Sequence, residues 1–263
     1  MTRQSARNAL FLGAMGLGPQ WTLRAAPEAV LELEPAQVLA SGAAGIQITT
    51  QLAGPVPALP VDAQAIAAMD WSALAFAAAS CTRCDLCHSR SSVVFGRGAR
   101  DAALIVLGSA PSSADEEAGA PLCGAPGQLL DNMLQAIKLA PPDVYVTNLV
   151  KCRARESAGA PPTPEQLVAC RPYLEREFTL LTQARTVLAL GQPAARSLLG
   201  AAVLSATLRG APHRCGALAV VATLHPEEML QGHAQNITEG MTEDKAKVWA
   251  DLCVARSAHA ASL

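Results

Sequence analysis

The sequence has no long apolar run, almost no net charge and few aromatic residues. Although 51% of its 263 residues are hydrophobic, no uninterrupted stretch of about 18 apolar residues occurs, which argues against a membrane span. The net charge of −2 excludes a general attraction to nucleic acid, so a basic binding surface has to be local. Aromatic residues make up only 3% and much of the apolar content is alanine, which limits the core to a few stretches.

Composition divides the chain into three parts. Residues 1–24 hold a short apolar stretch with Trp21, which predicts a peptide that docks on its own domain or on a partner, because tryptophan dominates interface hot spots. Residues 25–68 are rich in Ala, Pro and Gly and predict a flexible linker. Residues 69–263 are long enough for one folded domain.

Strand and helix patterns alternate along this domain. Four apolar, β-rich runs predict buried strands at residues 103–107, 144–148, 186–190 and 217–223. Helical patterns lie at residues 128–137, after a capping box at Thr163, and at residues 243–259. The alternation predicts the α/β class, a three-layer α/β/α fold with a central, mainly parallel four-stranded sheet.

Unusual polar residues follow three of the predicted strands. Gly108, Ser109 and Ala110 open a Gly- and Pro-rich loop, Asn148 ends the second strand, and His225 follows the last. Ligands of open α/β folds bind at this edge of the sheet. An asparagine amide can pair with the edge of a pyrimidine, and a histidine can donate to an oxygen that gains charge. Taken singly, these residues also suit turns and helix caps, but together they predict a binding pocket.

The cysteines form a metal-like pattern rather than a disulfide pattern. Eight cysteines are present, and Cys81 and Cys84 form a Cys-x-x-Cys motif in a chain too large to need disulfide staples. This pattern predicts metal or redox chemistry in a reducing cytoplasm. Basic residues lie close to the cysteines and are either solvated or available to phosphates. They are Arg83, Arg90, Arg97, Arg100, Lys151, Arg153 and Arg155.

Several ordered motifs resemble those of family 4 uracil-DNA glycosylases, the iron–sulfur type. Thr147-Asn-Leu-Val-Lys-Cys-Arg153 matches that family's motif without change, and Gly119-Ala-Pro-Leu-Cys-Gly-Ala-Pro-Gly-Gln-Leu-Leu130 is similar to a second. Cys81-Thr-Arg-Cys84, Leu190-Gly-Gln-Pro-Ala194 and His225-Pro226 fall in the family order. The resemblance covers about residues 74–231.

The resemblance implies an enzyme of base-excision repair that hydrolyses the N-glycosidic bond of uracil in DNA. Uracil is flipped out of the stack into the pocket. Asn148 reads its edge, His225 stabilises negative charge on the departing base, and Asp115 helps to place the water. The implied substrate-binding residues are Gly108, Ser109, Ala110, Leu122 and Asn148.

The same resemblance implies a [4Fe–4S] cluster on four cysteines. The matching positions are Cys81, Cys84, Cys152 and Cys170. Spacing alone leaves zinc open, because a tetrahedral zinc site also takes four thiolates. The cluster would hold the first cysteine segment against the loop at Cys152, as a structural staple.

Two departures from the family pattern favour a second hypothesis. Ser109 replaces a glutamate, and Leu122 replaces the aromatic residue that stacks on uracil, a contact worth about 1–3 kcal/mol per base. The alternative is therefore a weak or inactive binding subunit with the glycosylase fold. Met15-Gly16 followed by Trp21-Thr-Leu-Arg24 resembles the N-terminal peptide of the psi subunit of the DNA polymerase III clamp loader, which implies a tether to that partner through residues 1–24. In either version we expect a cytoplasmic monomer.

Overall fold

A computed structural model describes residues 63–140, 143–154, 160–200, 208–234 and 238–261. The predicted peptide of residues 1–24 and most of the predicted linker lie outside these ranges. The last linker residues instead form a helix, α2 (Ala63–Ala68), because Ile66 is buried against Tyr173 of a later helix. The described part of the chain thus includes a helix that precedes the predicted boundary at residue 69.

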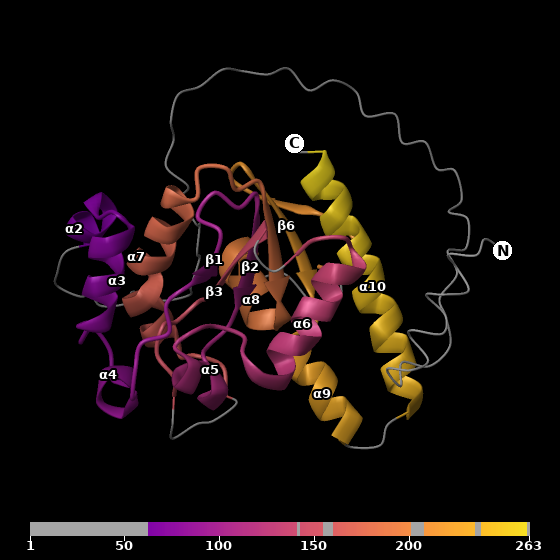
Figure 1. Cartoon of the computed structure of the whole chain (residues 1–263), viewed down its shortest axis with the longest axis horizontal. Coiled ribbons are helices and arrows are strands. Elements are labelled where there is room, and N and C mark those ends of the chain that lie inside the picture. The colour runs from indigo at the N-terminus through magenta and orange to yellow at the C-terminus, as the bar shows by residue number, and fades with distance from the viewer. Residues whose placement is uncertain (1–62, 141–142, 155–159, 201–207, 235–237, 262–263) are drawn as a thin grey trace. The chain divides into compact units, whose positions relative to one another are not determined.

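A six-stranded sheet forms the centre of the domain (Figure 1). Its order is β1-β3-β2-β4-β6-β5, and the four inner strands run parallel, as predicted. The two short antiparallel edge strands, β1 and β5, were not predicted from the sequence. The strands are β1 (Arg97–Gly98), β2 (Leu104–Gly108), β3 (Val144–Asn148), β4 (Thr186–Leu190), β5 (His213–Cys215) and β6 (Leu218–Thr223).

Helices cover both faces of this sheet. The described helices after α2 are α3 (Trp71–Ala79), α4 (Leu86–Ser89), α5 (Ser113–Ala118), α6 (Gly124–Ala136), α7 (Pro164–Leu180), α8 (Gly191–Leu199), α9 (Pro226–Ala234) and α10 (Thr238–Ala260). One core packs strand residues such as Ile105 and Val187 against α7 and α8. The other packs Val106 and Leu188 against α6 and α10. The three-layer α/β/α prediction is confirmed, because strands with apolar side chains on both faces need cover on both sides.

Local sequence signals account for most helix boundaries. Thr163 caps α7 through its hydroxyl and Gln166 closes the capping box, as predicted. The Asp70 carboxylate caps α3 by accepting from the backbone N–H of Ala73. Val248 and Leu252 of α10 are buried, whereas Trp249 of the same helix is 40% exposed. Within the described ranges, no helix is long and apolar enough to cross a membrane.

Candidate functional site

A cavity lies at the carboxyl ends of the parallel strands, the edge at which the sequence predicted a binding pocket. This cavity of about 410 Å³ is lined by the loop after β2, the start of α8, the start of α9 and the segment after Cys152. Of the predicted residues, Ser109, Ala110 and His225 line it directly. Arg153 and Glu228, which the sequence did not assign to the pocket, also contribute to its wall. The cavity therefore draws on four segments that are far apart in the sequence.

His225 is held as a neutral hydrogen-bond donor. The backbone N–H of Glu227 donates to its Nδ1 at 3.2 Å, so the ring proton of the neutral form lies on Nε2. Partial burial lowers the pKa of His225, and the nearby Asp115 carboxylate opposes this shift only in part. At neutral pH, Nε2–H is thus a donor that carries no positive charge. Gly191 permits this placement, since a Cβ there would lie 3.3 Å from the Cβ of His225.

Asn148 ends β3 as a buried side chain with unused hydrogen-bonding capacity. It is 2% exposed, and its Nδ2 has no hydrogen-bond partner. It pairs across the sheet with Gly108, where an added Cβ would lie 2.2 Å from Oδ1 of Asn148. A buried amide without a partner is costly, so such a group in a binding site points to a ligand acceptor. Ser109, the next residue after Gly108, also has a buried hydroxyl without a partner.

Asp115 and Leu122 are not among the residues that line this cavity, and neither are Gly108 and Asn148. Both Asp115 carboxylate oxygens accept from backbone N–H groups, one from Ser112 at 2.9 Å and the other from Cys123. Leu122 is 4% exposed and packs in the core between the sheet, α6 and α10. Its φ of +53° is rare for a branched side chain, and its carbonyl accepts from Arg97. In this structure, both residues hold the loop between β2 and α6, and their predicted contacts with substrate or water stay predictions.

The four predicted cysteine ligands line a second, smaller cavity. Cys81, Cys84, Cys152 and Cys170 meet there although they come from three separate segments. The Arg90 guanidinium donates to Sγ of Cys152 at 3.2 Å, and the backbone N–H of Lys151 donates to Sγ of Cys170 at 3.3 Å. Burial raises the pKa of Cys170 to about 12. Burial also raises the pKa of Cys152, and Arg90 opposes that rise.

Comparison with known families identifies the domain. The model of the uracil DNA glycosylase superfamily matches residues 95–253, which include both the pocket and the later cysteines. The chain belongs to this superfamily. A type-4 uracil-DNA glycosylase of Thermotoga maritima is 31% identical over 169 residues, which are 64% of this chain and 86% of that protein.

Two archaeal relatives match a shorter part of the chain. The type-4 uracil-DNA glycosylase of Pyrobaculum aerophilum is 36% identical over 120 residues, or 46% of this chain and 60% of that protein. That of Archaeoglobus fulgidus is 37% identical over 117 residues, or 44% of this chain and 57% of that protein. The chain therefore spans less than two thirds of these two relatives, and the resemblance seen in the motifs is confirmed at the level of the family.

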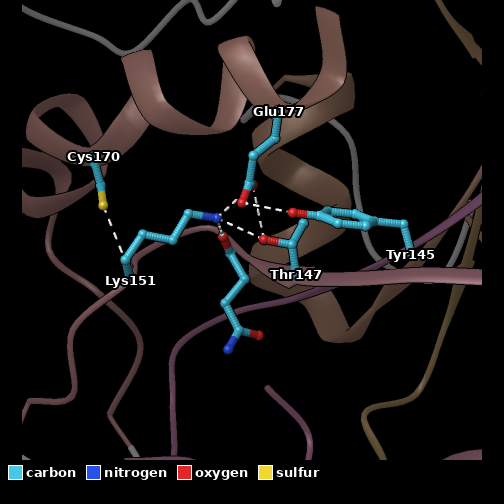
Figure 2. A network of polar contacts seen from close by, with 6 residues as sticks. Tyr145, Thr147, Lys151, Cys170 and Glu177 are labelled. Atoms are coloured by element: carbon cyan, nitrogen blue, oxygen red, sulfur yellow. Dashed lines mark hydrogen bonds and ion pairs between the residues drawn. The ribbon is translucent and has the colours of Figure 1, made fainter. Parts of the chain in front are cut away.

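The superfamily domain also contains a buried ion pair that sequence reasoning missed (Figure 2). Lys151 is 2% exposed and its Nζ lies 2.6 Å from Oε2 of Glu177, which is fully buried. The prediction that Lys151 is solvated or meets phosphates was wrong. One signal was present: Glu177 follows Cys170 by seven residues, so both lie on one face of the predicted helix.

Several of the arginines also bind the protein's own chain. Arg90 contacts Cys152 and the carbonyl of Ala79, while Arg97 donates to the carbonyls of Pro121 and Leu122. Arg100 lies over the ring of Trp71 at 5.3 Å. Arg153 differs because it faces the pocket, where it lies 3.6 Å from Glu116. Among the described arginines, Arg153 is the one that lines the pocket.

Proposed function

We propose that this protein excises uracil from DNA by hydrolysis of the N-glycosidic bond. One observation carries the proposal: a buried asparagine amide without a partner ends β3, and a neutral histidine with its Nε2–H available follows the end of β6 at the same edge of the parallel sheet. The relatives named above are uracil-DNA glycosylases, which supports the same reaction. A 410 Å³ cavity is large enough for a flipped nucleoside.

The roles of the two residues follow from their hydrogen-bonding capacity. The Asn148 amide offers a donor to a base carbonyl, which a uracil edge provides and the amino group of cytosine does not. When the bond between C1′ and N1 breaks, both electrons leave with the base, and the His225 Nε2–H stabilises the resulting oxygen charge. Water then adds to C1′ and its proton is released. A preformed donor of this kind contributes about 10²–10³ in rate.

The cysteine cavity supports a [4Fe–4S] cluster on Cys81, Cys84, Cys152 and Cys170. In the described part of the chain, no three His, Cys, Asp or Glu side chains converge closely enough to hold a single metal ion. The four thiols line one small cavity together, and four thiolates are the ligand set that a [4Fe–4S] cluster takes. When bound, the cluster would link the first cysteine segment to the loop after β3 and to α7.

The test is release of uracil from oligonucleotides by the iron-loaded protein. We expect release from wild type and a loss of about 100-fold or more in kcat for His225→Ala and for Asn148→Ala. Thr179→Ala, an exposed position on α7, is the control and keeps wild-type rates. Absence of release from single- and double-stranded substrates by folded, iron-loaded wild type would reject the enzyme and favour the binding subunit.

The remaining predictions about partners rest on the sequence. Attachment to the polymerase clamp loader depends on residues 1–24, which lie outside the described ranges. Pull-down of the clamp loader by the full chain, with Trp21→Ala as the comparison, tests this tether. The monomeric state and the cytoplasmic location also stay predictions.

A further inference from the structure

We propose that the buried pair Lys151 and Glu177 positions Asn148 for base recognition. The inference rests on the proposed function, because it assigns Asn148 the base-reading role. The pair does not contact substrate. It acts on the backbone of the residue that does, since the Lys151 Nζ donates to the carbonyl oxygen of Asn148 at 3.0 Å.

The hydrogen bonds of the Lys151 ammonium are fully accounted for. Its three N–H groups have three acceptors: Glu177 Oε2 at 2.6 Å, Thr147 Oγ1 at 2.6 Å and the Asn148 carbonyl at 3.0 Å. These acceptors come from three directions, so together they define where the ammonium sits. The backbone carbonyl of Asn148 is thereby tied to a fixed point inside the protein.

Glu177 is equally constrained on its own side. Its Oε2 accepts from Thr147 at 2.9 Å as well as from Lys151, and its Oε1 accepts from the Tyr145 hydroxyl at 3.0 Å. Burial raises the pKa of Tyr145, so that hydroxyl stays protonated and donates. Figure 2 shows Tyr145, Thr147 and Lys151 all directed toward the carboxylate of α7. Glu177 thus links Tyr145 and Thr147 of β3, and also Lys151, to helix α7.

The backbone carbonyl of Asn148 is held by a hydrogen bond, but the Nδ2 of its side chain is not. Its amide is buried next to Gly108, and its Nδ2 has no partner within the protein to orient it. A group meant for a ligand cannot be held by its own hydrogen bonds, so its direction has to come from the backbone. The network supplies that direction by holding Thr147 on one side and the Asn148 carbonyl on the other.

Stability alone does not call for such a pair. A buried ion pair can often be replaced by apolar groups of similar volume without loss, whereas removal of one partner leaves an unpaired buried charge. The double variant Lys151→Met/Glu177→Gln therefore separates position from stability. It removes both charges together, keeps the volumes close, and leaves the Asn148 carbonyl without its donor.

The experiment compares this double variant with wild type in three measurements. We expect iron content and thermal stability close to those of wild type, a kcat for uracil release about 10- to 100-fold lower, and a KM within about 2-fold. KM changes little because contacts with the DNA backbone dominate affinity. Free uracil, titrated by calorimetry, should bind more weakly to the variant, a measurement that needs no catalysis.

Matched variants decide between positioning and general damage. Arg209→Met/Asp251→Asn removes another ion pair, 2.8 Å long with Asp251 1% exposed, and should keep kcat and uracil affinity at wild-type values. Thr147→Val removes one hydroxyl of the network without a charge change. It should lower kcat in the same direction, which keeps the test decisive if the double variant fails to fold.

The outcomes separate this inference from the proposed function. Wild-type release with unchanged kcat in folded Lys151→Met/Glu177→Gln, or in folded Thr147→Val, overturns the positioning role and leaves the glycosylase intact. No release by wild type rejects the proposed function instead. In that case uracil binding still decides, because equal affinity in wild type and folded double variant rejects positioning.

Discussion

At the scale of single residues, Gly108 sets the space available to Asn148. The two residues pair across β2 and β3, and a methyl group at Gly108 would lie 2.2 Å from the asparagine Oδ1. Gly108→Ala therefore has to displace the Asn148 amide, to which we assign the reading of the base. We expect kcat for uracil release to fall about 10- to 100-fold, since small misplacements of positioning groups have effects of this size.

A second glycine provides the control for this substitution. Gly119 has φ +66° and open space around it, so Gly119→Ala carries backbone strain of about 1–2 kcal/mol without any clash. Its unfolding free energy should fall by that amount while kcat stays at the wild-type value. Suppose that Gly108→Ala keeps full activity and loses about as much unfolding free energy as Gly119→Ala. The position of the Asn148 amide then does not depend on the space that Gly108 leaves.

At the scale of secondary structure, the N-terminal cap of α7 offers a clean test. The Thr163 hydroxyl accepts from the backbone N–H of Gln166, and the Gln166 Oε1 accepts from the backbone N–H of Thr163. Thr163→Ala should lower the unfolding free energy by about 1 kcal/mol. For a domain of this size, that is a decrease in Tm of about 2–4 °C, measured by circular dichroism.

Thr179→Ala on the same helix is the comparison. Its hydroxyl bonds back to the carbonyl of Glu175 at 2.8 Å and leaves no helix-terminal group unsatisfied when removed. Its effect should stay within about 0.5 kcal/mol, as for ordinary surface changes. Equal losses in the two variants would mean that the cap contributes nothing beyond loss of a surface hydroxyl.

The elements that the sequence predicted share a physical basis. The four inner strands are continuous apolar runs buried on both faces, and the α7 start carries a capping box, so local chemistry was sufficient. β1 and β5 span two and three residues, too few to show any periodicity. Each forms only by pairing with a neighbouring strand, and a short stretch of sequence does not show that pairing.

The residue types of the candidate site could be predicted from the sequence, but the contacts that hold these residues in place could not. Asn148 and His225 stood out because each is a polar group at the end of an apolar run. Lys151 was misassigned because a lysine is normally exposed, and its partner Glu177 is distant in the sequence. The tautomer of His225 was also out of reach, since it depends on the Glu227 N–H.

At the scale of the whole domain, the cysteine cavity connects segments that are far apart in the chain. Cys170→Ala should lower iron and sulfide content and decrease Tm, because a ligand is lost from the proposed cluster. Cys215→Ala is the matched control. Cys215 is also buried, at 6% exposed, but belongs to the core under α8, so its iron content should equal that of wild type. Equal iron content in both variants would contradict the ligand assignment.

The strand order also determines when this domain can fold during synthesis. Leu104 of β2 pairs with Thr186 of β4, and β4 in turn pairs with β6, which ends at Thr223. The centre of the sheet therefore stays open at an edge until the ribosome has released most of the chain. Long-range parallel pairings of this kind fold slowly and expose apolar strands to aggregation. A nascent chain that stalls before β4 presents the unpaired edge of β2, which makes it a natural substrate for chaperones.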